Sequence, residues 1–140
     1  VAKVGDPMIP FVAGMLSSAS SVSKVMLAGG TQMAAVLAFA SKIGFDDENT
    51  AIGTTSYITD DESANFKELI QKIADVPMIS VDPGLKDSRH AGLRAFSEGF
   101  AKEGVGAGGS IISSMIKTKN NSAKFLELVE EEYRRLFTWL

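Results

Sequence analysis

The sequence predicts an α/β protein with a Rossmann-like parallel sheet, helices covering both faces of the sheet, and a helical C-terminal part. Three observations support this fold class. Short apolar runs alternate along the chain with segments of helical spacing. Within the runs, apolar and polar residues do not alternate, and a turn rich in glycine or proline follows the runs. Continuous apolar strands are typical of parallel sheets that are buried on both faces. Because the chain has 140 residues, we expect residues 1–140 to form a single α/β domain.

The first part of the chain predicts a helix, a strand and a second helix. Asp6 can cap a helix that has Pro7 in its first turn, where the missing N–H of proline is not needed. A serine-rich break is expected from Ser17 to Ser23. The apolar run Val25–Ala28 predicts a strand, and Thr31 is a suitable cap for a helix through Ser41.

Two further strands are expected. Gly44 ends the second helix, and Ala51–Thr59 is rich in the Thr, Ile and Tyr residues that strands favour. Asp60 or Asp61 can cap the next helix, and Pro77–Val81 predicts a third buried strand. The apolar face of that helix consists of Phe66, Leu69, Ile70 and Ile73.

Beyond Asp82-Pro83-Gly84 the pattern is helical, with helices expected at about Ser88–Glu98, Gly108–Lys117 and Ala123–Leu136. The inward residues of the last helix are expected to be Phe125, Leu128, Val129 and Leu136. Ligands of open parallel sheets bind beyond the carboxyl ends of the strands. We therefore expect the turns that follow the three strands to lie along one functional edge.

Composition excludes several kinds of function. Fourteen Lys and Arg against 17 Asp and Glu give a net charge of −3, and no basic stripe suggests nucleic-acid binding. The apolar stretch Met33–Ala40 is far shorter than the ~20 residues of a membrane span. No cysteine is present, which fits a cytoplasmic protein. With His90 as the one histidine, we expect no metal site and interpret His90 as structural.

Two glycine segments are candidates for ligand binding. Gly29-Gly30-Thr31 joins a strand to a helix N-terminus and can hold a phosphate, although the glycines can equally serve only a tight turn. Glu103 precedes four glycines within residues 104–109, and such a loop more often lies against a ligand than in solvent. Asp82-Pro83-Gly84 has the chemistry of an ordinary turn.

The C-terminal helix carries two further features. Glu130-Glu131-Glu132 followed by Arg134-Arg135 has the spacing of a charged, exposed helix face. Large apolar residues end the chain, and we expect them to dock on their own domain or on a second subunit. These residues are Tyr133, Phe137, Trp139 and Leu140.

Four segments resemble, in this order, the motifs of one enzyme family. They are Gly5-Asp6-Pro7-Met8, Ala28-Gly29-Gly30-Thr31-Gln32-Met33, Ser80-Val81-Asp82-Pro83-Gly84 and Glu103-Gly104-Val105-Gly106-Ala107. The last is similar to a Glu-Gly-x-Gly-Ala signature and is the most specific match. The third is similar to a Ser-x-Glu-Pro-Gly segment, with Asp82 where bacterial members have glutamate. The family is nicotinate-nucleotide:dimethylbenzimidazole phosphoribosyltransferase, especially its archaeal branch.

This resemblance implies transfer of phosphoribose from nicotinate mononucleotide to a benzimidazole-type base, which yields the α-ribazole phosphate of the cobamide nucleotide loop. It implies Glu103 as the catalytic base and no cofactor or metal. The phosphate would be held by Gly29, Gly30 and Thr31, by Asp82, Pro83 and Gly84, or by Gly104 and Gly106. The family's N-terminal loops are missing, so we expect a C-terminal portion that is inactive alone. We also expect a homodimer, with the C-terminal helices as one route to it.

Two other classes of function remain open from the residues alone. A non-catalytic nucleotide-binding or regulatory domain can use the same glycine turns at a sheet edge. An interaction domain can be built around the C-terminal helix. The orientation of Glu103 separates the first alternative from an enzyme, because a base must face the same pocket as the glycine turns.

Overall fold

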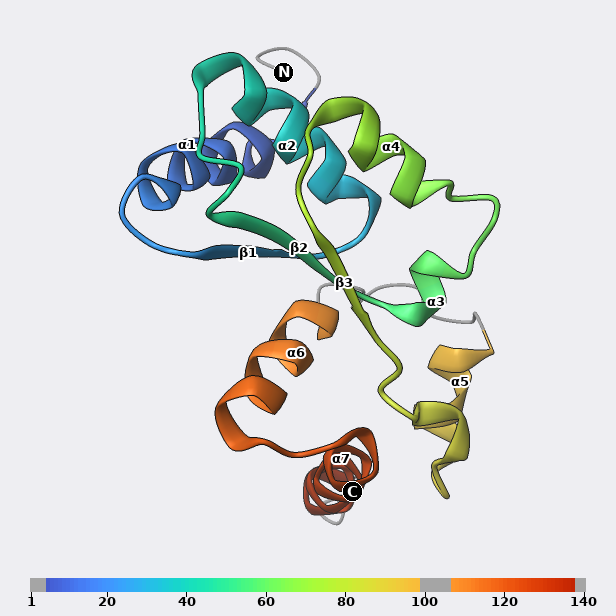
Figure 1. Cartoon of the computed structure of the whole chain (residues 1–140). Coiled ribbons are helices and arrows are strands. Elements are labelled where there is room, and N and C mark those ends of the chain that lie inside the picture. The colour runs from blue at the N-terminus through green and yellow to red at the C-terminus, as the bar shows by residue number, and fades with distance from the viewer. Residues whose placement is uncertain (1–4, 99–106, 138–140) are drawn as a thin grey trace.

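The computed structural model describes residues 5–98 and 107–137, which form three layers (Figure 1). The central layer is a parallel sheet of β1 (Val25–Ala28), β2 (Thr50–Thr55) and β3 (Met78–Val81), in the order β1-β2-β3. Leu27 pairs with Ile52, and Ile52 with Met78. The helices are α1 (Met8–Ser20), α2 (Thr31–Ile43), α3 (Ser56–Thr59), α4 (Phe66–Ile73), α5 (Ala91–Ser97), α6 (Ala107–Thr118) and α7 (Ser122–Phe137). The predicted fold class is confirmed.

The main core lies between the sheet and the layer formed by α1, α2 and α4 (Figure 1). Side chains from all three helices and from the strands are fully or almost fully buried there. They include Leu16, Val36, Leu37, Ile52, Phe66 and Ile70. Burial of each such side chain contributes about 1.5–3 kcal/mol relative to exposure. This layer holds the strands in register, so that their carboxyl ends meet at one edge.

The opposite face of the sheet is covered by α6, and two glycines allow the helix to touch the strands. A Cβ at Gly108 would lie 2.2 Å from the carbonyl carbon of Thr54, and one at Gly109 would lie 2.4 Å from the Cβ of Ala28. A Cβ atom is essentially never found this close to an atom to which it is not bonded, so only glycine fits at either position. The glycines therefore bring the first turn of α6 against the last residues of β1 and β2.

Several expected boundaries were wrong. Helix α1 continues through the serines to Ser20, whose hydroxyl accepts the N–H of Asp46 at 2.9 Å. Strand β2 ends at Thr55, and the next four residues form the helical turn α3. Helix α4 begins after Asn65 rather than at Asp60 or Asp61, and Leu69 is exposed. These errors share one cause: tertiary contacts decide where a helix or strand ends, and local propensity does not reveal those contacts.

The helix expected at Ser88–Glu98 begins three residues later than predicted. A 3-10 turn, η1 (Leu85–Asp87), and an extended stretch precede α5, which begins at Ala91. The last helix also differs from expectation, since Leu128 and Leu136 are 41% and 62% exposed rather than buried. Tyr133 stacks between His90 and Phe137, with ring centroids 4.9 and 4.5 Å away, although Phe137 is largely exposed. Trp139 and Leu140 lie outside the described residues.

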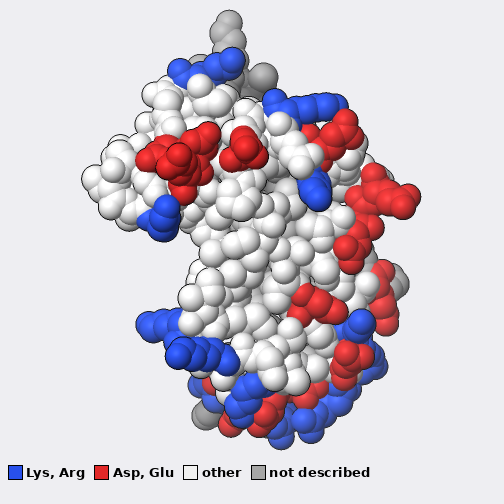
Figure 2. Space-filling view, in the orientation of Figure 1, with Lys and Arg blue, Asp and Glu red and all other residues white. Residues whose placement is uncertain are grey.

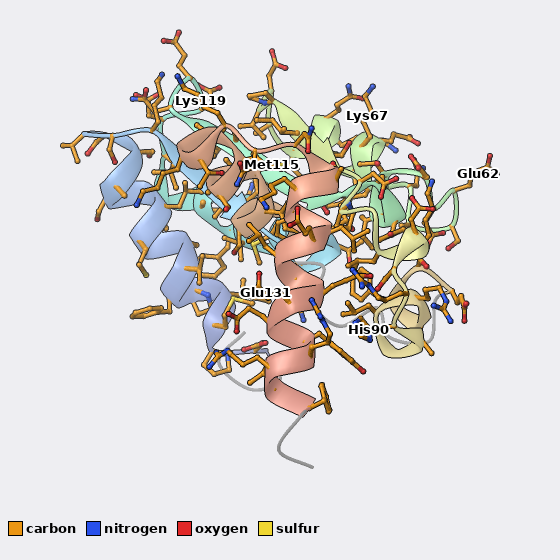
Figure 3. The ribbon with its side chains drawn as sticks, turned by 90° about the horizontal axis from the view of Figure 1, so that it is seen from below. Glu62, Lys67, His90, Met115, Lys119 and Glu131 are labelled. Carbon is orange, nitrogen blue, oxygen red and sulfur yellow. The ribbon has the colours of Figure 1, made fainter. Side chains whose placement is uncertain are left out.

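A buried carboxylate fastens α7 to the segment after β3. Glu130 is only 5% exposed, and its Oε1 accepts the Ser88 hydroxyl at 2.8 Å and the Arg89 N–H at 2.7 Å. Its Oε2 binds the Arg89 Nε at 2.6 Å. Figure 3 shows α5 and His90 on this side of α7. The predicted exposed face is therefore wrong for Glu130, while the Glu132–Arg135 ion pair at 2.7 Å fits it.

We expect Gly108→Ala to lower the free energy of unfolding by at least about 1–3 kcal/mol, because the added methyl group collides with strand backbone that cannot move aside. Gly14→Ala is the matched control, since Gly14 lies inside α1 with open space around its Cα. That variant should gain about 0.5–1 kcal/mol from helix propensity. Denaturant unfolding measures both changes, and an unaltered Gly108→Ala midpoint would contradict the close packing of α6.

We expect Glu130 to make the fold sensitive to acid. Hydrogen bonds from the Ser88 hydroxyl and the Arg89 backbone lower its pKa from 4.5 to about 2. Since the folded state has the lower pKa, the stabilisation is complete above about pH 4.5 and is lost as the pH falls through about 2.

The test is unfolding as a function of pH for Glu130→Gln and for Glu131→Gln, an exposed neighbour on the same helix (Figure 3). Glu130→Gln should be less stable than the parent protein at pH 7. Its free energy of unfolding should also fall less than that of the parent between pH 4.5 and 2. Glu131→Gln should keep the parent profile. Identical profiles for the two variants would show that the hydrogen bonds of Glu130 to Ser88 and Arg89 do not stabilise the fold.

Candidate functional site

The carboxyl ends of the three strands, with the segments that follow them, form the candidate site (Figure 1). Gly29-Gly30-Thr31 follows β1, Ser56 follows β2, and Asp82-Pro83-Gly84 follows β3. Helix α2 begins at this edge, and the first turn of α6 reaches it through Gly108. Two helix N-termini therefore direct partial positive charge towards one edge of the sheet.

The structure divides the glycine turn after β1 into two roles. Gly29 is buried, its N–H donates to the Gly53 carbonyl at 3.0 Å, and the Met33 side chain fills the space beside it. Gly30 caps α2, so Thr31 is the first helical residue and not the expected cap. Within the described part of the chain, the N–H groups of Thr31 and Gln32 have no acceptor. Gly29 thus serves packing, whereas Thr31 and Gln32 present N–H groups that are free among the described residues.

Two hydroxyls that sequence reasoning missed lie at the end of β2. Thr54 and Thr55 are fully buried, and neither Oγ1 has a hydrogen-bond partner among the described residues. Alternation along the strand directs Thr54 to the face of Ile52, which α2 covers, and Thr55 to the face of α6. An unpaired buried hydroxyl costs about 1–3 kcal/mol, so such groups normally have a water or ligand as partner. The sequence signal that could have found these hydroxyls is the pair of adjacent threonines at the end of a buried strand.

The segment after β3 is a well-satisfied turn, as its chemistry predicts. Asp82 Oδ1 accepts the N–H of Gly84 at 2.8 Å, and Oδ2 lies 3.6 Å from the Lys86 Nζ. The Asp82 carbonyl accepts the Ser122 hydroxyl at 2.8 Å. Gly84 has a φ of 72°, which favours glycine. The Asp82 carboxylate is thus held by its own turn and adds negative charge at this edge.

Tyr57 connects the turns after β2 and β3. Its ring meets the edge of Phe96, with centroids 5.4 Å apart. Burial raises the pKa of the Tyr57 phenol, and the nearby Asp82 carboxylate raises it further. The phenol therefore stays neutral near pH 7 and can act there as a hydrogen-bond donor.

The remaining sequence candidates are placed as follows. Glu103, Gly104 and Gly106 lie outside the described residues, and α6 begins at the next position of their motif, Ala107. His90 precedes α5 and is half-buried against Tyr133, and its buried Nε2 has no hydrogen-bond partner among the described residues.

Three further features of the described residues bear on function: the distribution of surface charge, the arrangement of potential metal ligands, and the length and polarity of the helices. Across the face seen in Figure 2, charged side chains gather above and below, the left and middle of the band between them show none, and acidic side chains lie at its right edge. In residues 5–98 and 107–137, no group of three or more His, Cys, Asp or Glu is arranged to hold a metal ion. None of the helices in these ranges is long and apolar enough to cross a membrane.

Comparison with known proteins gives relatives whose names state no activity. No protein-family model matches the chain. UPF0284 proteins of Methanopyrus kandleri and Aeropyrum pernix are each 42% identical to it, over 85% and 95% of the chain and 31% and 38% of their own lengths. A UPF0284 protein of Picosynechococcus is 38% identical over 93% of the chain and 37% of its own length. The chain is thus similar to UPF0284 proteins along most of its length and spans about a third of theirs.

Proposed function

We propose that the full-length protein transfers phosphoribose from nicotinate mononucleotide to a benzimidazole-type base. One observation carries this proposal. The Glu103-Gly104-Val105-Gly106-Ala107 segment resembles the signature of that enzyme family, and its last residue begins the helix whose first turn touches Thr54 at the carboxyl edge. This is the edge at which ligands of parallel α/β sheets bind.

The reaction explains the need for a carboxylate. A ring nitrogen of the base forms a bond to C1′ of the ribose, and the bond from C1′ to the nicotinate nitrogen breaks with its electron pair. The configuration at C1′ inverts to give the α-linked nucleotide. The other ring nitrogen of the attacking base must lose a proton, and we assign Glu103 to accept it. The proposal needs no metal or cofactor.

For the phosphate, the described residues favour the start of α2. In the part of the chain that the structure describes, Thr31 and Gln32 offer free N–H groups at a helix N-terminus, and Thr54 has a buried, unpaired hydroxyl on the face that α2 covers. Gly29 is less suitable because the Met33 side chain occupies its surroundings. Asp82 is less suitable because a carboxylate repels an anion. Gly104 and Gly106 remain the alternative phosphate site.

The proposal includes a homodimer formed through the C-terminal helices. Helices α6 and α7 leave an apolar groove of about 400 Å³, which Phe125, Leu128 and Leu136 help to line. Grooves of this kind accept the apolar face of another helix. A helix from a second subunit would cover Leu136, which is now largely exposed.

We expect Glu103→Gln in the full-length protein to lower kcat by roughly 10²–10⁴-fold, the usual loss for a general base. Affinity for nicotinate mononucleotide should change little, because the variant keeps the shape of the side chain. Glu98→Gln is the matched control, since Glu98 is exposed at the end of α5. The readout is release of nicotinate in the presence of a panel of benzimidazole-type bases.

Near-normal turnover of Glu103→Gln would remove this residue from the mechanism. Binding of the mononucleotide without turnover by the parent protein, for every base tested, would favour the non-catalytic nucleotide-binding domain instead.

We expect Gly30→Val to weaken binding of nicotinate mononucleotide by at least about tenfold, or about 1.4 kcal/mol, because a branched side chain obstructs the N–H groups at the start of α2. Titration calorimetry on the full-length protein measures this change. Gly14→Ala serves as the control, because Gly14 lies within α1, away from the carboxyl edge. Unchanged affinity in a folded Gly30→Val variant would move the phosphate to the turn after β3 or to Gly104 and Gly106.

A further inference from the structure

Strand β1 has an open edge. The N–H groups of Val25 and Gly29 donate towards β2, to the carbonyls of Asn49 at 2.7 Å and Gly53 at 3.0 Å. Backbone groups alternate along a strand, so those of Met26 and Ala28 point away from β2. In the described ranges nothing pairs with that side of β1. The strand carries no proline or charged residue of the kind that protects exposed edges.

The position of α1 indicates what lies beyond this edge. Helices α1, α2 and α4 lie side by side on one face in the same order as β1, β2 and β3 (Figure 1). Helix α2 leads from β1 to β2, and α4 leads from β2 to β3. Crossovers between parallel strands are right-handed in about 98% of cases. By the same rule, a crossover through α1 into β1 must start from a strand on the outer side of β1.

The exposed surface of α1 agrees with such a neighbour. Ala13 and Leu16 are buried beneath α1, yet Phe11 and Met15 are 70% and 57% exposed one turn apart on another side. A helix that is apolar on several sides is typical of one that is covered on several sides. Most of each relative lies outside the matched segment, because the chain covers only 31–38% of the Methanopyrus and Aeropyrum proteins.

We propose that in the full-length protein the outer edge of β1 pairs with a parallel strand from the part of the sequence that precedes α1. The carboxyl end of that strand would lie at the same edge as Gly29 and Gly30, so the loop after it would complete the candidate site on this side. The elements that accompany the strand would cover Phe11 and Met15. This inference rests on topology and not on the proposed reaction.

The test is native-state hydrogen exchange of the full-length protein, resolved to single amides by NMR. The amides of Met26 and Ala28 should exchange on the order of a hundredfold more slowly than that of Asp47, an internal control in an exposed loop. A scalar coupling across each hydrogen bond should identify the accepting carbonyl in a residue that precedes α1. Fast exchange of both amides would overturn the proposal.

Two other outcomes would also overturn it. Slow exchange without a coupling to a carbonyl would mean that α6 or another element only shields the edge. Slow exchange of Met26 and Ala28 could also be lost on dilution, over the concentration range in which light scattering shows that an oligomer dissociates. That result would mean that β1 pairs with a second copy of the protein. Turnover is not measured, so failure of the phosphoribosyltransferase proposal leaves this result unaffected.

Discussion

The contact between α6 and the sheet is the constraint on which the candidate site depends. A helix normally lies on a sheet at a distance set by its side chains, but Gly108 and Gly109 let the backbone of α6 approach the backbone of β2 and the end of β1. This fixes the first turn of α6 at the carboxyl edge. The segment that carries Glu103 directly precedes that turn in the sequence, so the position of its end depends on the close packing of these two glycines.

Around this contact, the two layers have different roles. The layer of α1, α2 and α4 supplies most of the buried apolar surface and aligns the three strands. The other layer is smaller, and Glu130 strengthens it by joining α7 to Ser88 and Arg89 after β3. Burying a carboxylate is costly unless its oxygens are bonded, and here both of them are. The turn after β3 is therefore held from two sides, by its own Asp82 and by α7.

At the carboxyl edge, satisfied and unsatisfied groups separate structural residues from candidates for binding. The polar groups of the turn after β3 are bonded within the protein, which is the pattern of a structural element. By contrast, the Thr54 and Thr55 hydroxyls and the N–H groups of Thr31 and Gln32 have no partner among the described residues. Buried polar groups in native proteins nearly always form hydrogen bonds. A ligand could bind these four groups without breaking an existing hydrogen bond within the described residues.

The sequence by itself determined the fold class, because short apolar runs between helical segments are typical of a parallel sheet covered by helices. The third strand was expected to be buried, but β3 is only partly covered, and Ile79 is 40% exposed. It also located the turns after the first and third strands at one edge, since parallel strands share the direction of their carboxyl ends. The second turn was misplaced, because β2 ends at Thr55 and the expected strand ran to Thr59. Tertiary structure decided what these turns do. Local chemistry could not show that Met33 fills the space beside Gly29, that the Thr54 hydroxyl has no partner in residues 5–98 and 107–137, or that Glu130 is buried. Each of these facts depends on which residues, distant in the sequence, come into contact in the folded protein. Neither hydrophobic periodicity nor secondary-structure propensity encodes such contacts.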